Sequence, residues 1–250
     1  MENQLVRFLP WDTNHFGHRI GRANIRRLDE ASWQLLRDAC KQMEIDCLYF
    51  LADAGDLSSI NELQRHGFIF VDVRVTIERT VPDAETPPSR RSIGDAILRP
   101  SRVDDVETLA AIARDSFTVT RFFADPFLDN EKVSAMYQIW ITKSVTTDFA
   151  DRVIVAEVNR ESVGFVTCHL DRHLHEGKIA LAALAASARG KGYSGAMIQH
   201  ALEWFRDQGM ERVNVPTQGS NISAQRMYQR RGFVTRSTEL WFHKWFRTMP

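Results

Sequence analysis

The sequence has 250 residues, 44% of them hydrophobic, which suffices for one large domain or two small domains with packed cores. Its 32 basic and 32 acidic residues cancel, and this neutral balance argues against nucleic acid or an anionic membrane as the main partner. There is no membrane-spanning apolar run and no signal-peptide pattern, and three cysteines are too few for a zinc site, so we expect a cytoplasmic protein without membrane insertion or a metal.

Residues 1–81 alternate between strand and helix patterns. The expected elements are strands at 5–9 and 20–28, a helix at 29–43 capped by Asp29 or Ser32, a buried strand at 47–52, a helix at 57–66 and a half-buried strand at 68–78. Residues 11–17 are too polar and aromatic for a core element, and too ordered in composition for a linker.

Residues 82–95, with three prolines, are expected to be a linker to a second unit at 96–250. That unit should contain a strand at 96–99, a helix after a Ser101–Asp104 capping box, an irregular segment at 116–130, a helix at 132–143 and a hairpin of strands 153–158 and 163–170. His169, His173 and His175 follow; we interpret them as a polar hairpin tip rather than a metal site.

A glycine-rich turn then joins a strand at 179–184 to a helix at 196–205. Gly190 and Gly192 permit positive φ angles and close backbone approach, and the helix start directs N–H groups and a positive dipole toward an anion. Arg189 and Lys191 add positive charge. The sequence lacks GxxxxGK[ST] and GxGxxG, so this pattern predicts a phosphate site of another kind.

A second motif follows a short strand at 212–216. Asn221 precedes a helix at 222–230 that carries Tyr228, Gly232 fits the helix C′ position, and Phe233 opens a last strand at 234–242. Tyr228 is either a proton donor or an ordinary core aromatic residue.

The segment from Leu63 to Phe68, LQRHGF, echoes YQRRGF from Tyr228 to Phe233. The first unit is therefore predicted to be a partial copy of the second. It has leucine in place of Tyr228 and no glycine-rich turn, so we expect it to shape an acceptor site rather than to catalyse.

The motifs Arg189-x-x-Gly192-x-Ser194 and Asn221-x-x-Ala224-x-x-x-Tyr228 resemble those of the GNAT superfamily of N-acetyltransferases. The resemblance implies an α/β (α+β) fold, with a complete GNAT unit at 96–250 after a partial, degenerate unit at 1–81. It implies acetyl-CoA as the acetyl donor and Tyr228 as the acid that protonates the CoA thiolate. The residues implied to contact the cofactor are Leu184, Ala188, Arg189, Gly190, Lys191, Gly192, Tyr193, Ser194 and Asn221.

Within the superfamily the chain is similar to the dTDP-fucosamine acetyltransferases, through Trp11-Asp12, Phe16-Gly17, Arg121-Phe122 and the run from Tyr137 to Trp140. This resemblance implies an amino-sugar nucleotide of the dTDP-4-amino-4,6-dideoxygalactose type, used for surface polysaccharides, as acceptor. Arg121 would pair with its diphosphate, and Trp11, Phe16 or Phe122 would pack on sugar or base. Alternatively, the aromatic residues are core and Arg121 is solvated.

Several points stay open. Residues 178–184 carry no carboxylate, so no general base is assigned. The acceptor could be another small amine, an amino acid, an antibiotic or a protein N-terminus, or the chain could be a non-catalytic CoA-binding module. Trp241, Trp245 and Phe246 form either a homodimer surface or the end of the core.

Overall fold

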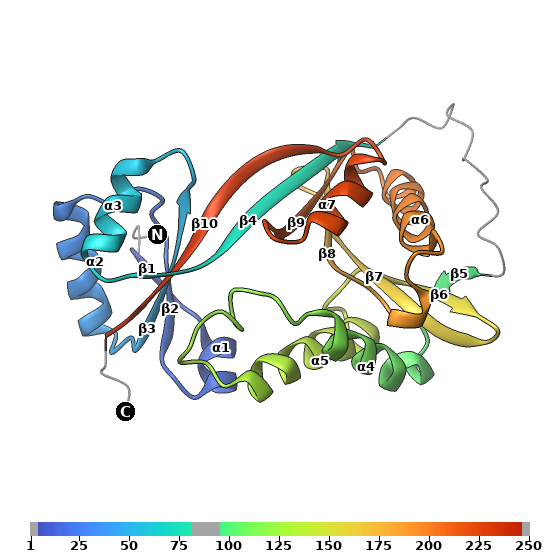
Figure 1. Ribbon diagram of the computed structural model, residues 1–250, viewed down its shortest axis with the longest axis horizontal. Coiled ribbons are helices and arrows are strands. Elements are labelled where there is room, and N and C mark those ends of the chain that lie inside the picture. The colour runs from blue at the N-terminus through green and yellow to red at the C-terminus, as the bar shows by residue number, and fades with distance from the viewer. Residues whose placement is uncertain (1–4, 82–95, 247–250) are drawn as a thin grey trace.

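A ten-stranded mixed sheet runs through the computed structural model, which describes residues 5–81 and 96–246 (Figure 1). The predicted linker at 82–95 lies outside the described residues. We refer to residues 5–81 as the first half and to residues 96–246 as the second half. Within these ranges, no helix combines the length and apolar character needed to cross a bilayer.

The first half contains β1 (Val6–Phe8), α1 (Pro10–Phe16), β2 (Ile20–Ala23), α2 (Glu30–Gln42), β3 (Cys47–Asp53), α3 (Leu57–Arg65) and β4 (Ile69–Thr80). Both predicted cap residues of α2 take part in one capping box, since Asp29 Oδ1 accepts from Ser32 N (2.8 Å) and Ser32 Oγ accepts from Asp29 N (2.9 Å). Residues 11–16 belong to α1, which begins at Pro10, and Gly17 caps the C-terminus of this helix with φ 81°. The strand expected at 20–28 ends at Ala23.

The second half contains β5 (Ile97–Pro100), a 3₁₀ turn (Val103–Asp105), α4 (Val106–Ser116), α5 (Asn130–Thr146), β6 (Arg152–Val158), β7 (Glu161–Asp171), β8 (Glu176–Leu184), a 3₁₀ turn (Ala186–Ala188), α6 (Tyr193–Asp207), β9 (Arg212–Gln218), α7 (Ile222–Gln229) and β10 (Val234–Trp245). The predicted Ser101–Asp104 capping box is wrong. Asp105 instead accepts from Arg102 N (2.6 Å), because the half-buried side chain of Arg99 binds its carboxylate and holds it at this position (2.8 Å). His173 and His175 lie in the predicted hairpin tip between β7 and β8, whereas His169 lies within β7 and pairs with Lys178.

The two halves exchange their last strands. The sheet order is β1-β2-β3-β10-β4-β9-β8-β7-β6-β5, so β10 of the second half pairs with β3, and β4 of the first half pairs with β9. Both strands cross the middle of the molecule and pair with each other (Figure 1). The internal repeat is visible here, since Gly67 and Gly232 end α3 and α7 with φ angles of 71° and 77°.

Helices cover both faces of this sheet (Figure 1). Side chains of α1, α4 and α5 pack on one face, and those of α6 and α7 pack on the other face in the second half. A third core lies beneath α2 and α3 in the first half. Trp241 is 8% exposed, and Trp245 and Phe246 pack against these cores, so all three contribute to packing within the chain.

Candidate active site

The glycine-rich turn opens α6 as the sequence predicts. Gly190 and Gly192 have φ angles of 78° and 87°, and a Cβ atom at either position would meet nothing within 4 Å. Gly192 is the N-cap residue of α6, and no side chain caps the first turn of this helix. The start of α6 thus directs backbone N–H groups that no side chain caps toward the position of an anion.

The predicted cofactor residues around this turn fall into two groups. Leu184, Ala188 and Tyr193 are buried in the core beneath α6, so they can present only backbone groups to a ligand. The second group lies at the surface. The turn itself consists of exposed residues, Arg189, Gly190, Lys191 and Gly192, and Ser194 after it is half-buried. Arg189 Nε donates to Leu184 O (3.3 Å), which ties the turn to the end of β8.

Arginines of α7 and of the residues that follow it face the turn across a surface pocket. This pocket is bounded by Gly190, Gly192 and Ser194 on one side and by Arg226 and Arg230 on the other. The guanidinium group of Arg231 lies against Gly195, where a Cβ atom would clash with it. The pocket thus combines a helix start without a side-chain cap with several cations, which suits a pyrophosphate.

Strands β8 and β9 diverge beside this pocket. They pair in parallel only from Glu176 to Lys178 on β8, opposite Arg212 to Asn214 on β9. Beyond these residues, the two strands border a cavity of about 290 Å³. Asn221, Ala224 and Tyr228 of the α7 motif line the cavity, and Asn221 Oδ1 also caps α7 by accepting from Ala224 N (3.2 Å).

Tyr228 is 3% exposed and its ring meets Phe233 edge-on, with ring centroids 5.2 Å apart. Its hydroxyl makes no hydrogen bond with another residue of the described ranges. Burial, and secondarily the nearby Cys168, raise the pKa of Tyr228 above its usual value of 10.0. The phenol therefore carries its proton at neutral pH and can act as an acid.

Another part of the cavity lining is aromatic and cationic. Phe117, Thr120, Arg121, Phe122, Tyr137, Trp140 and Trp241 line it. Two of the predicted acceptor residues, Arg121 and Phe122, are thus brought to the cavity. The other two, Trp11 and Phe16, are not in its lining: Phe16 is buried and stacks on Phe122 with centroids 5.9 Å apart, and Trp11 packs on Trp140.

Arg121 is held by a buried hydrogen-bonded network. Its Nη1 lies 2.8 Å from His243 Nε2, and His243 Nδ1 lies 2.6 Å from Asp125 Oδ2. A guanidinium can only donate and an ionised carboxylate can only accept, so the imidazole donates through Nδ1 and accepts through Nε2. Burial lowers the pKa of His243 to about 4, so the ring is neutral at pH 7. The network therefore sets the orientation of Arg121.

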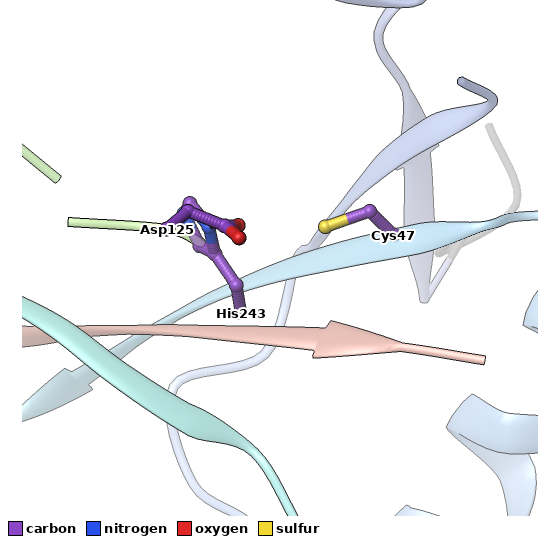
Figure 2. Close-up of side chains that lie close together, drawn as sticks. All are labelled: Cys47, Asp125 and His243. Carbon is purple, nitrogen blue, oxygen red and sulfur yellow. The ribbon is translucent and has the colours of Figure 1, made fainter. Parts of the chain in front are cut away.

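Asp125 and His243 also lie close to the Cys47 thiol (Figure 2). The three side chains offer ligand atoms within 4.8 Å of one another. However, His243 Nε2 is already engaged by the Arg121 cation, and burial raises the pKa of the Cys47 thiol well above its usual value, with Asp125 adding to this effect. We therefore interpret the cluster as a hydrogen-bonded network and not as a metal site.

Sequence reasoning missed Asp72, Arg74 and Trp241, which also line the cavity. They lie on β4 and β10, the two exchanged strands, and Asp72 is opposite Trp241 in their register. Burial raises the pKa of Asp72, against the opposing effects of the Val73 backbone N–H and of Arg121. The alternation along residues 68–78 was the available signal, because it placed Asp72 and Arg74 on one polar face.

Comparisons with known proteins agree with this geometry. The sequence profile of the acetyltransferase (GNAT) family matches residues 106–233. Spore coat polysaccharide biosynthesis protein SpsD of Bacillus subtilis is 28% identical over 225 residues, covering 88% of this chain and 73% of that protein. The dTDP-fucosamine acetyltransferase of Escherichia coli is 23% identical over 237 residues, covering 94% of this chain and 96% of that protein.

A solved structure also matches nearly the whole chain. A GCN5-related N-acetyltransferase from Sphaerobacter thermophilus has a TM-score of 0.67 at 14% sequence identity, covering 98% of this chain and 77% of that one. At this identity the likeness concerns the fold alone.

Proposed function

The chain belongs to the acetyltransferase (GNAT) family, and we propose that it transfers an acetyl group from acetyl-CoA to the amino group of a nucleotide-activated amino sugar. The proposed acceptor is of the dTDP-4-amino-4,6-dideoxygalactose type, used for surface polysaccharide. The observation that carries the proposal is one cavity that joins Tyr228, at the divergence of β8 and β9, to Arg121 and Trp241. It offers an acid together with a cationic, aromatic surface.

The donor would bind along α6 and α7. The uncapped N–H groups after Gly192, with Arg226 and Arg230 opposite, suit the pyrophosphate of acetyl-CoA. Asn221 and Ala224 line the cavity from the side of α7, where the pantetheine arm would pass between the diverging strands. The thioester would then lie beside Tyr228.

The reaction is a direct transfer. The acceptor amine attacks the thioester carbonyl carbon, a C–N bond forms and the C–S bond breaks. The sulfur leaves with the electron pair as a thiolate, and Tyr228 donates its proton to it. The raised pKa of Tyr228 ensures that the proton is present at neutral pH.

Among the described residues, Asp72 is the carboxylate that lines the cavity, so it is our candidate for the group that receives the proton from the amine. A carboxylate can also attract the acceptor in its ammonium form and hold it near the thioester. Burial raises the pKa of Asp72, which makes it a better base than a solvated aspartate. It would act once the ammonium has been drawn into the cavity.

Two observations favour a sugar-nucleotide acceptor. The relatives matched over most of this chain are named for spore coat polysaccharide biosynthesis and for dTDP-fucosamine acetylation. The cavity also presents Arg121 and Phe122 together, a cation with aromatic surface, which suits a phosphorylated sugar.

The test is release of free CoA thiol from acetyl-CoA with a panel of amines. The panel contains dTDP-4-amino-4,6-dideoxygalactose, its 3-amino and gluco-configured relatives, free amino acids, an aminoglycoside and a peptide. We expect turnover on a dTDP-amino sugar. Turnover only on the other amines would contradict the proposed acceptor and leave the acetyltransferase activity, whereas binding of acetyl-CoA without any turnover would favour a binding module.

A further inference from the structure

Three guanidinium groups converge on the ring of Trp241, near the centre of the sheet. The guanidinium carbons of Arg22, Arg74 and Arg121 lie 5.1, 5.7 and 4.3 Å from its ring centroid. They come from β2, from β4 and from the irregular segment before α5, so only the tertiary structure assembles them. We call these three residues the arginine cluster.

Carboxylates neutralise this cluster in part: Asp12 and Asp72 lie close enough to Arg121 for its charge to oppose the rise in their pKa values, and Glu239 binds Arg74. Glu239 is shared, because its Oε2 accepts from Arg74 (2.5 Å) while its Oε1 accepts from Arg26 (2.9 Å). Arg22 forms neither a hydrogen bond nor an ion pair through its side chain with any residue in 5–81 or 96–246. Its contact is the face of Trp241, so its guanidinium donors remain unused.

The cations also affect one another. Burial lowers the pKa of Arg22 to about 10, and the charges of Arg74 and Arg121 contribute next. Burial likewise lowers the pKa of Lys178 on β8, followed by the charges of Arg74 and Arg22. Cations held this close repel one another, and an anion bound among them relieves that repulsion.

The arginine cluster is continuous with the catalytic cavity. Arg74, Arg121 and Trp241 line the same cavity as Tyr228, and Arg22 lies on the same tryptophan. Asp72 adds one carboxylate to this lining. The charge pattern therefore suits a ligand that carries one ammonium group and several negative charges.

We propose that the arginine cluster is the binding site for the diphosphate group of the acceptor. A carboxylate or a phosphodiester carries a single charge, whereas a diphosphate presents oxygen acceptors on two phosphorus atoms to several guanidinium forks. The identity of the acceptor rests on the proposed function. The claim that this site binds a diphosphate can be tested separately.

The test uses the full chain saturated with CoA, so that the site at the start of α6 is filled. Calorimetric titrations compare thymidine 5′-diphosphate, thymidine and inorganic pyrophosphate. We expect the diphosphate to bind at least about tenfold more tightly than thymidine, and its affinity to fall as NaCl is raised.

Arg22→Gln is the informative variant, because it removes a cation without breaking an ion pair. We expect it to weaken thymidine 5′-diphosphate binding about tenfold or more and to leave CoA affinity unchanged. Arg22→Lys, which keeps the charge, should restore part of the loss. Arg27→Gln is the matched control, since its side chain is 92% exposed and lies outside the cluster, and it should bind as the wild type does.

Equal diphosphate affinity in Arg22→Gln and wild type would overturn this inference, even if the protein acetylates a nucleotide sugar. Equal affinity of the wild type for thymidine and its diphosphate would overturn it as well. Conversely, pyrophosphate binding that depends on Arg22 would support the anion site even if no amino-sugar nucleotide in the panel is acetylated, and only the proposed function would then fail. Unchanged CoA binding by Arg22→Gln shows that this variant is folded.

Discussion

Tyr228→Phe tests the proposed acid with little disturbance of the structure. The hydroxyl has no hydrogen-bond partner in the described residues, so its removal leaves no other group unsatisfied, and the ring keeps its edge-on contact with Phe233. We therefore expect a change in unfolding free energy of about 1 kcal/mol or less, or a shift of about 2–4 °C in the melting temperature. A lost general acid should lower kcat about 10²–10⁴-fold, which corresponds to about 3–5 kcal/mol in the barrier.

The assay is steady-state thiol release on the accepted amine, together with calorimetric titration of CoA. CoA affinity should not change, because its predicted contacts lie along α6 and at Asn221. Tyr137→Phe is a matched control, since it removes a hydroxyl from another wall of the cavity, and we expect its kcat to stay within about threefold of the wild type. Because the pKa of Tyr228 is raised, wild-type kcat should not fall through loss of this proton below about pH 10.

The reasoning would be refuted by a kcat in Tyr228→Phe within about twofold of the wild type. A parallel loss of CoA affinity would show instead that the hydroxyl acts in binding.

Three further predictions concern other parts of the chain. Asp72→Asn should lower kcat/KM about 10²-fold or more. It should also remove the acidic limb from the pH profile of kcat/KM, and in the wild type this limb should lie above the usual aspartate pKa of 3.8. An unchanged pH profile would exclude Asp72 as the base. Gly164→Ala should lower the free energy of unfolding by about 1–3 kcal/mol in denaturant titrations, because its Cβ would lie 2.7 Å from the Ala183 carbonyl oxygen of the paired strand. Gly55→Ala, in an exposed turn, is the control. Hydrogen bonds from Arg99 hold the pKa of Asp105 below its usual value. This pair therefore stabilises the fold above about pH 4, and its contribution is lost as the pH falls further. The difference in unfolding free energy between the wild type and Asp105→Asn should shrink at acid pH.

The donor side of the candidate site could be predicted from the sequence because its parts are local. Gly190 and Gly192 adopt the positive φ angles that a turn before a helix requires, and Asn221 caps the helix that it precedes. Each of these features depends on residues only a few positions apart. The spacing of the two motifs therefore carries nearly all the information that positions them.

The acceptor side could not be predicted in the same way, because its contacts join distant residues. Arg121 was expected either to meet a diphosphate or to be solvated, but the fold places it against His243, which follows it by 122 residues. Asp72 and Trp241 become neighbours only because β4 and β10 pair. The repeat at Leu63 and Tyr228 indicated two related units, but a repeated pattern does not specify which unit receives each final strand.

The exchange of β4 and β10 also has a consequence for how the chain is made. During synthesis from the N-terminus, β3 emerges long before β10, because the segment from α3 to α7 is translated between them, and β10 occupies the place beside β3. The first half therefore keeps an open strand edge, and the apolar side chains of its core lack Phe242, until β10 has left the ribosome. Folding of the two halves is thus expected to finish together, and a chain truncated before residue 234 should be prone to aggregation rather than yield a stable first half.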